Sequence, residues 1–449
     1  MCAPKTNRAA SRLLQLCNLR AIDPQSLVLH STAMKIAIIG AGISGLGAAY
    51  LLARDHEITI YEKNNYAGGH SRTVDVPGSG GPVPVDTGFI VFNNWNYPNL
   101  LGLFRALDVP YQKSDMSFGV SINDGWLEYA SGGLLAQKRN LLRPQYWCMI
   151  ADILRFNKNA PAYIEKSPSI SLRECLDELG MGAWFRRYYI LAMGASIWSC
   201  PVETILEFPA RTFLQFFKNH GLLSIKNRPQ WYTVTGGSRE YVKKLVADFP
   251  GNVKLAMPAQ RVFSSHGGKV EVEDAYGGKE IFDHVIFACH ADEALEILQN
   301  PTPDQFSVMA AFRYQENRIV LHGDISFMPR RRKCWASWIY ISQAREDKSA
   351  AVSLSYWMNN LQKLETEEPL IVTLNPGREP DPDLIYDRHT FSHPIFDSAA
   401  IEAQGRIPSI QGKNNIWFCG AYQRYGFHED GLLSAVNVAK SLGADVPWE

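Results

Sequence analysis

The chain has 449 residues, more than one hydrophobic core normally supports, so we expect two interleaved domains. Its 45 Lys and Arg residues balance 45 Asp and Glu residues, which excludes an electrostatic case for nucleic-acid binding. No apolar run approaches the roughly 18 residues that cross a bilayer, which predicts no transmembrane helix. The eight cysteines stand singly, without metal-ligand spacing, and favour a reduced cytoplasmic protein with no metal site.

Residues 1–33 differ in composition from the remainder of the chain. They carry four basic residues and a single acid, Asp23. Arginine and serine with few acids are typical of organelle transit peptides, so mitochondrial or plastid import is one interpretation. A disordered extension, or a start codon upstream of Met34, is the other. We exclude the segment from the fold.

A glycine-rich turn follows the first predicted strand, Lys35–Ile39. Gly40 allows the chain to turn sharply, and Gly42 lets backbone N–H groups approach a pyrophosphate. Gly45 lets the next helix pack closely against the sheet, and the N-terminus of that helix offers free N–H donors to phosphate. The pattern predicts the first βαβ unit of a dinucleotide-binding domain.

A second predicted strand, Glu57–Tyr61, ends in Glu62, twenty-two positions after Gly40. A carboxylate at this point accepts hydrogen bonds from a ribose 2′-OH and disfavours a 2′-phosphate. The fingerprint does not separate NAD from FAD, and a glycine-rich loop without a ligand is the alternative.

Two further loops follow the first unit and favour FAD. In "AGGHSRT" (Ala67–Thr73) a second glycine pair turns the chain under the dinucleotide, and Ser71, Arg72 and Thr73 supply donors for phosphate oxygens. In "PVDTGFIVFN", Asp86 and Gly88 are predicted to lie near the cofactor.

The middle of the chain alternates between helical and strand patterns. Residues 97–107, 146–166, 171–179 and 182–198 have helical spacing, and short β-branched strands begin at Trp231. Aromatic residues are dense in the helical region and suit a large apolar substrate, although at helical spacing they are more often core. The predicted segments are an extension (1–33), an FAD-binding domain (34–95, 231–301 and 412–449) and a substrate domain (96–230, helical, and 302–411).

A basic stretch, "HGDISFMPRRRKCWASW", lies in the second part of the predicted substrate domain and contains four consecutive cations, Arg330–Lys333. We interpret it either as the site of an anionic head group at the mouth of a cavity or as a solvated basic loop beside core tryptophans.

The C-terminal stretch "FCGAYQRYGFHEDGLLSAVNVAKSL" places Gly420 after a buried strand and Gly431 at the start of a predicted helix, 431–442. That helix end can stabilise negative charge on a reduced flavin. His428 precedes it and is our candidate for proton transfer at the flavin, with a structural histidine as the alternative. Asp430 is interpreted as an N-cap of the helix.

Four stretches, in this order, resemble the glutathione-reductase-type FAD fold: the glycine-rich turn with Glu62, "AGGHSRT", "PVDTGFIVFN" and the C-terminal stretch with Gly420 and Gly431. They resemble more closely the flavin amine oxidase superfamily, which includes monoamine oxidase, protoporphyrinogen oxidase and phytoene desaturase. "YWMNNLQ", "VTLNP" and "GFHEDGL" resemble a subgroup of FAD-dependent amine-oxidase-like proteins often encoded beside cyclopropane-fatty-acid synthases. The resemblance implies an α/β fold: a Rossmann domain built from discontinuous segments and an interleaved α+β substrate domain. The predicted FAD contacts are Gly40, Gly42, Ile43, Ser44, Gly45, Glu62, Gly68, Gly69, His70, Arg72, Asp86, Gly88, Val262, Gly420, Gly431 and Leu432.

The chain departs from the superfamily pattern at three points. Ala421 follows Gly420 where the superfamily often has an acidic residue, and Glu429 and Asp430 come later. His70 stands where an arginine usually follows the glycine pair, with Arg72 two places later. The lysine that many amine oxidases place near flavin N5 has no assigned counterpart in this chain, which favours a desaturase-like or electron-transfer role over an oxidase. We therefore predict an FAD-dependent oxidoreductase that takes a hydride equivalent from an apolar or lipid substrate, and leave a peripheral membrane contact open. The alternatives are an amine oxidase, a redox-neutral flavin isomerase and a non-catalytic flavin-binding protein.

Overall fold

The structure is a computed structural model that describes residues 33–166, 170–198, 202–224, 228–247, 251–264, 267–342 and 353–449. Residues 34–449 form one unit. The predicted N-terminal extension lies outside the described residues, apart from Ala33. In the part of the chain that the structure describes, no helix is both long and apolar enough to cross a membrane.

A parallel sheet of five strands carries the glycine-rich turn. Its order is β10–β2–β1–β14–β21, and every neighbouring pair is parallel. Both faces of such a sheet are covered, which is why its strands are apolar runs rather than alternating ones. The strands come from distant parts of the chain: β1 (Lys35–Ile39), β2 (Glu57–Tyr61), β10 (Asn252–Lys254), β14 (His284–Phe287) and β21 (Ile416–Phe418).

Helices α1 (Ile43–Leu52) and α14 (His428–Ser441) pack against each other beside this sheet, and α2 (Pro98–Ala106) and α9 (Arg239–Ala247) join the same core. Helix α14 starts three residues before the predicted Gly431. The Asp430 carboxylate stabilises this start because it accepts the Phe427 N–H at 3.0 Å from the third helical position, as the acidic half of a capping box does. Asp430 therefore caps the helix from inside it rather than from the residue before it.

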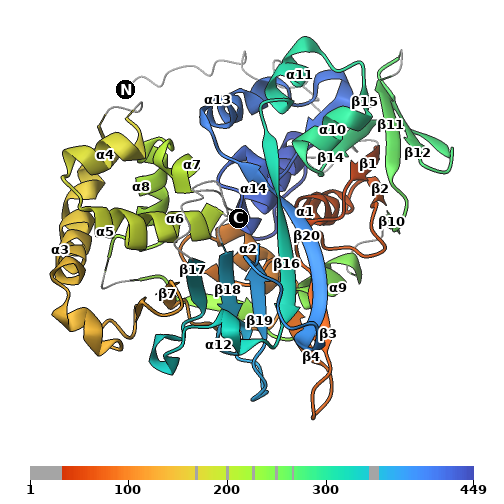
Figure 1. Cartoon of the computed structure of the whole chain (residues 1–449). Helices are drawn as coiled ribbons and strands as arrows, with labels where there is room; N and C mark the ends of the chain where they lie inside the picture. The colour runs from red at the N-terminus through yellow and green to blue at the C-terminus, as the bar shows by residue number, and fades with distance from the viewer. Residues whose placement is uncertain are drawn as a thin grey trace, which may run out of the picture. The chain divides into compact units, whose positions relative to one another are not determined.

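A seven-stranded sheet in the order β20–β16–β19–β18–β17–β7–β8 forms the second half of the unit. It joins two strands from the helical region to five from the later part of the chain. Figure 1 shows helices α3 to α8 gathered on one side of it and the parallel sheet on the other. The strands are β7 (Phe118–Ile122), β8 (Leu127–Ala130), β16 (Arg313–His322), β17 (Trp338–Ser342), β18 (Ser353–Trp357), β19 (Ile371–Leu374) and β20 (Ile385–Ile395).

The helical region packs its aromatic side chains against strands β7, β8 and β17 in a core of its own. A capping box at Ser171 and Glu174 starts one of its helices as the sequence pattern suggests. Its longer helices are α3 (Pro144–Asn159), α4 (Leu172–Glu178), α6 (Leu191–Trp198) and α8 (Ala210–Asn219), with short α5 (Ala183–Phe185) and α7 (Val202–Leu206) between them.

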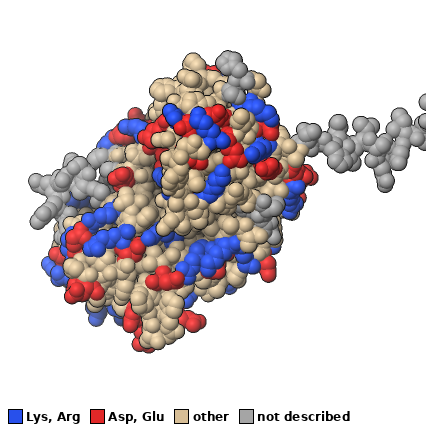
Figure 2. Space-filling model, turned by 90° about the vertical axis from the view of Figure 1, so that its right-hand side faces the viewer, with Lys and Arg blue, Asp and Glu red and all other residues tan. Residues whose placement is uncertain are grey.

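A third sheet, β13–β12–β11–β15, lies at the edge of the unit. The face that includes it shows basic and acidic side chains interspersed (Figure 2), and its ion pairs include Lys279 with Glu271 at 3.0 Å. Two small sheets, β3–β4 and β5–β9–β6, contain the other strands. The strands of the third sheet and of the two small sheets are β3 (Thr73–Val76), β4 (Val83–Asp86), β5 (Phe92–Asn93), β6 (Tyr111–Lys113), β9 (Trp231–Val234), β11 (Ala259–Ser264), β12 (Val270–Asp274), β13 (Lys279–Phe282) and β15 (Leu298–Gln299).

Candidate cofactor and substrate site

One cavity of about 760 Å³ extends from the glycine-rich turn after β1 to the aromatic side chains of the helical region. Backbone and polar groups of the parallel-sheet half form one end, which we call the loop end. Apolar side chains of α6, α8 and the seven-stranded sheet form the other, which we call the apolar end. The side chains of the apolar end include Met116, Phe118, Met193, Ile197, Trp198, Phe216, Ile319, Trp338, Tyr356, Val372, Leu374 and Phe396.

The N-terminus of α1 opens onto the loop end. Its N-cap, Gly42, makes no side-chain cap, and the first turn contains no acid, so the N–H donors of this turn are left for a ligand. Gly40 has φ +106°, and a Cβ there would lie 2.9 Å from the Ala288 carbonyl oxygen. A Cβ on Gly45 would lie 1.9 Å from the Gly40 carbonyl oxygen, so the close crossing of strand and helix depends on glycine at this position.

Glu62 lies directly beneath the turn, 5% exposed, and lines the cavity. One carboxylate oxygen accepts the Ala41 N–H at 2.8 Å, and the other accepts the backbone and side-chain N–H groups of Asn64, both at 2.8 Å. Since each carboxylate oxygen has two lone pairs, the oxygen bound to Ala41 can accept a further hydroxyl. Glu62 therefore shapes the turn as well as offering an acceptor to a ribose.

The second glycine pair lies against the first turn. The Gly68 N–H donates to the Ala41 carbonyl oxygen at 2.7 Å, which brings Gly69 and His70 into the cavity lining. Arg72 points elsewhere: its guanidinium forms a bidentate pair with Asp387, at 2.7 and 2.9 Å. Its side chain is outside the cavity lining. That placement is at odds with the predicted phosphate contact.

Asp86 also lies outside the cavity lining, where its carboxylate accepts hydrogen bonds from other parts of the protein. It is fully buried, and its carboxylate accepts the Ser238 N–H at 2.8 Å, the Thr73 hydroxyl at 2.6 Å and the Gln362 side-chain amide at 2.9 Å. Burial raises its pKa to about 6. This carboxylate joins three distant segments, so its position explains the residue type without a cofactor contact. Thr73, predicted as a phosphate donor, donates to Asp86 instead.

His428 lines the cavity as the first residue of α14. Its Nε2 lies 2.7 Å from the Tyr241 hydroxyl and 3.1 Å from the Ser71 hydroxyl, and its ring stacks on Phe89 at 3.8 Å. Burial lowers the pKa of His428 to about 3. The imidazole is therefore neutral at physiological pH, and the prediction that it exchanges a proton near neutrality is at odds with this environment.

Glu429, next to His428, turns away from the cavity. Its two oxygens accept the Asn99 N–H at 3.0 Å and the Leu100 N–H at 2.9 Å, in the first turn of α2. Burial raises the pKa of Glu429 to about 7. A carboxylate thus closes the N-terminus of α2, in contrast to the open N-terminus of α1.

The cavity divides the predicted cofactor residues into two sets. Val262 is fully buried in β11, and Pro258 and Ala259 line the cavity in its place. Gly431 packs against α1, where a Cβ would approach the Ser44 hydroxyl to 2.9 Å. The residues that line it are Gly40, Gly42, Ile43, Ser44, Glu62, Gly69, His70, Gly88, Gly420 and His428; those outside the lining are Gly45, Gly68, Arg72, Asp86, Val262, Gly431 and Leu432.

Sequence reasoning missed a group of histidines in the cavity wall. His389 and His393 flank Phe391 on β20, and His70 stacks on Phe391 at 4.3 Å. The strict alternation along β20 could have indicated that these three residues share one face. Burial lowers the pKa of His393 to about 4, which makes this wall neutral. Among the described residues, no three His, Cys, Asp or Glu side chains are placed to hold a metal ion.

Comparison with known proteins places this geometry in a wider context. A family model described as an NAD(P)-binding Rossmann-like domain matches residues 38–107. A stretch of 37 residues, 8% of the chain, is 62% identical to the 4,4'-diapophytoene desaturase (4,4'-diaponeurosporene-forming) of Staphylococcus aureus (strain Newman). The match spans only 7% of the length of that curated relative.

Solved structures match nearly the whole chain. The CLA-producing fatty acid isomerase from P. acnes has a TM-score of 0.67 at 14% identity and covers 92% of this chain and 100% of its own. Wild-type putrescine oxidase bound to putrescine has a TM-score of 0.64 at 14% identity and covers 91% and 99%. The chain has the fold of these solved structures. The predicted α/β fold with a Rossmann domain is confirmed, and the predicted resemblance to flavin amine oxidase-like proteins is confirmed at the level of the fold.

Proposed function

We propose that this flavin amine oxidase-like protein is an FAD-dependent oxidoreductase that acts on an apolar substrate. The observation that carries the proposal is one continuous cavity, which connects an open helix N-terminus to a wide apolar wall. The loop end fits a dinucleotide because it combines free N–H donors with a buried carboxylate at the end of β2. The Gly42–Ser44 backbone would hold the pyrophosphate and Glu62 the ribose.

The apolar end supports an aliphatic or acyl substrate over a charged amine. Lys63 is the one lysine or arginine among the described residues that line the cavity, and it pairs with Glu293 at the loop end. The acids of that lining, Glu62, Glu293 and Glu296, belong to the same end. An alkylammonium group at the apolar end would therefore lack a carboxylate partner, whereas an acyl chain would bury apolar surface against apolar side chains.

The bound FAD would supply an acceptor for two electrons, and the cavity wall would exclude water from the reacting carbons. In a desaturation, one hydrogen would leave the substrate with its electron pair, which FAD would accept, and a neighbouring hydrogen would leave as a proton released to solvent, so that a double bond forms. Turnover then needs an external electron acceptor such as a quinone or dioxygen. Because His428 and His393 are neutral, they would position the substrate and the flavin rather than donate protons.

A redox-neutral isomerase is the second candidate. Moving a double bond along an acyl chain needs no external acceptor, and the solved structure with a TM-score of 0.67 is named as a fatty acid isomerase. The two candidates share the cofactor and the apolar end. They differ in whether the flavin remains reduced after one turnover.

Anaerobic mixing of the purified protein with acyl lipids that co-purify with it tests both candidates. We expect release of FAD on denaturation and stoichiometric loss of flavin absorbance on mixing. Rearranged lipid without net loss of absorbance would assign the isomerase. Bleaching by primary or secondary amines, and by no lipid, would overturn the apolar substrate, and a denatured supernatant with NAD or no nucleotide would overturn the cofactor.

A further inference from the structure

A surface outside the cavity combines exposed apolar side chains with cations. It consists of residues 134–147, between β8 and the first turn of α3, and the loop 330–333. Leu135 is 58% exposed and Leu142 is 84% exposed, and Leu134, Leu141 and Trp147 are exposed beside them. We call this the amphiphilic surface. The interpretation of Arg330–Lys333 as a cavity-mouth site is not supported, since none of these residues lines the cavity.

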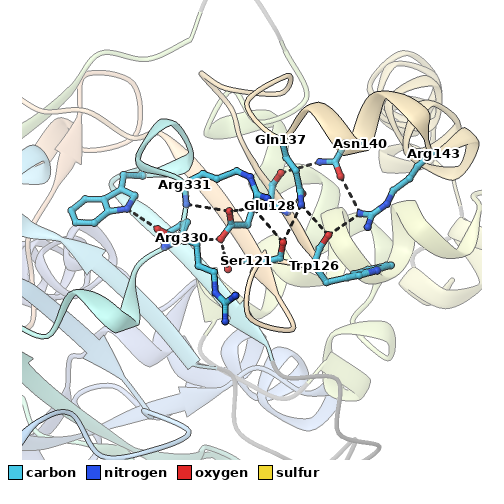
Figure 3. A network of polar contacts seen from close by, with 11 residues as sticks. Ser121, Trp126, Glu128, Gln137, Asn140, Arg143, Arg330 and Arg331 are labelled. Carbon is cyan, nitrogen blue, oxygen red and sulfur yellow. Dashed lines mark hydrogen bonds and ion pairs between the residues drawn. The ribbon is translucent and has the colours of Figure 1, made fainter.

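A buried carboxylate joins the two segments of the amphiphilic surface. Glu128, fully buried at the start of the preceding hairpin strand, accepts the Arg330 N–H at 2.7 Å and pairs with the Arg331 guanidinium at 2.8 Å. Its backbone also holds the leucine segment, donating to Gln137 at 2.7 Å and accepting from Asn140 at 3.0 Å. Figure 3 shows this network, which fixes the cationic loop against the leucines.

The amphiphilic surface has an excess of positive charge. Its chain segment contains no acid between Tyr129 and Ala151 but includes Lys138, Arg139 and Arg143. Arg143 covers the Trp126 ring at 4.5 Å, and its pKa is lowered by burial and by the neighbouring charges of Arg139 and Arg331. The face with interspersed acids and bases in Figure 2 has the opposite character.

We propose that the amphiphilic surface docks on an anionic lipid bilayer. Leucine and tryptophan side chains can enter the boundary between head groups and acyl chains, while lysine and arginine meet anionic head groups from the same surface. Each basic residue near such a membrane strengthens binding by about fivefold. A nucleic acid would neutralise the cations but would leave the leucines in water.

Charge also argues against a second copy of this chain as the occupant. A two-fold dimer would place the surface opposite itself, so that like charges would face each other across the interface. The proposal goes beyond the proposed function, because docking needs no flavin chemistry and can be measured on the intact protein without substrate.

The test is co-sedimentation of the full-length protein with vesicles of equal parts phosphatidylcholine and phosphatidylglycerol, compared with phosphatidylcholine alone. We expect binding to the anionic vesicles that weakens with salt. Leu135→Glu/Leu142→Glu should weaken it at least about tenfold. A matched control, Ile281→Glu/Phe306→Glu, changes two side chains that are 59% and 57% exposed outside the surface and should bind like the parent.

A second pair separates charge from apolar insertion. Lys138→Gln/Arg139→Gln should bind anionic vesicles more weakly, by tens of fold, and with less salt dependence, whereas Arg54→Gln/Lys113→Gln, exposed cations elsewhere, should not. Melting curves check that the variants fold, and Leu135→Ser/Leu142→Ser replaces any glutamate variant that does not. Absence of parental binding, or equal binding by the leucine variant, would overturn the proposal. The proposal would also be overturned if sedimentation velocity showed that the parent is a dimer and that only the leucine substitutions make it a monomer.

Discussion

The backbone determines the shape of one end of the cavity, and side chains determine the shape of the other. At the loop end, positions are set by the backbone: a Cβ on Gly45 would lie 1.9 Å from the Gly40 carbonyl oxygen. At the apolar end, side chains from α6, α8 and the seven-stranded sheet set the shape, and no single residue fixes it. The first end tolerates few residue types, whereas the second can be reshaped by exchanging one apolar side chain for another. The two ends should therefore be separable by mutation.

The largest effect is expected for Gly45→Val. The new side chain would overlap the Gly40 carbonyl oxygen and force the turn and helix α1 apart, so the variant should purify without flavin. The flavin-to-protein absorbance ratio measures this, with Gly377→Val, where an added Cβ meets nothing within 4 Å, as the control. Normal flavin content in Gly45→Val would mean that the loop end does not depend on close backbone approach.

Glu62→Gln should weaken FAD binding by roughly a hundredfold. Replacing one carboxylate oxygen by an amide removes charge-assisted acceptance from Ala41 or from the ribose, each bond being worth about 1.5–3 kcal/mol. Titration of the apoprotein with FAD gives the dissociation constant. Glu57→Gln, an exposed acid on the same strand, should leave it unchanged. An unchanged constant for Glu62→Gln would remove Glu62 from the ribose site.

His428→Gln should change the acid stability of the protein more than its chemistry. The pKa of His428 is about 3 in the folded chain, below the ordinary 6.5, so the unfolded chain binds the extra proton. The contribution to stability is complete above pH 6.5 and is lost as the pH falls toward 3. Between pH 7 and 5 the parent should lose about 2 kcal/mol more than the variant in urea unfolding.

A pH profile of flavin reduction provides the complementary readout for His428. If the imidazole stays neutral, the profiles of parent and His428→Gln should have the same shape between pH 5 and 8. A limb near neutrality that disappears in the variant would restore His428 as an acid or base and contradict the neutral wall.

Met193→Ala should show the smallest effect and confine it to the apolar end. Removing an apolar side chain that lines the cavity should raise the KM for an acyl substrate by about tenfold while FAD remains bound. Steady-state kinetics at matched flavin content measures it. Loss of flavin from this variant would contradict the independence of the two ends.

The loop end could be predicted from the sequence because the residues that form it lie close together in the chain. Strand β1, the turn after it and Glu62 lie within 28 residues, Lys35 to Glu62, and each glycine has a steric reason that does not depend on distant segments. Arg72 and Asp86 depend on distant partners instead. Asp387 lies 315 positions from Arg72, and Ser238 lies 152 positions from Asp86. No sequence pattern near Arg72 or Asp86 indicates these partners.

The apolar end and the start of α14 were harder to predict for a related reason. The cavity wall joins helices to strands more than a hundred residues further along the chain, and helical spacing alone does not distinguish a core aromatic from a cavity aromatic. At α14, the prediction placed the helix start at Gly431, three residues too late, because Asp430 accepts the N–H of Phe427 from inside the helix. A Glu-Asp pair ahead of an apolar run was the available signal.

The pairing of β1 has a consequence for how the chain is made. One edge of β1 pairs with β2, which follows within 22 residues (Lys35 pairs with Glu57). Its other edge can pair only after β14 has been synthesised, because Ile36 pairs with His284. At about 5–20 residues per second, a ribosome takes roughly 10–50 s to reach that partner. During this interval an apolar strand edge is open to any passing strand. Nascent chains of this protein should therefore need chaperone protection until β14 has emerged from the ribosome.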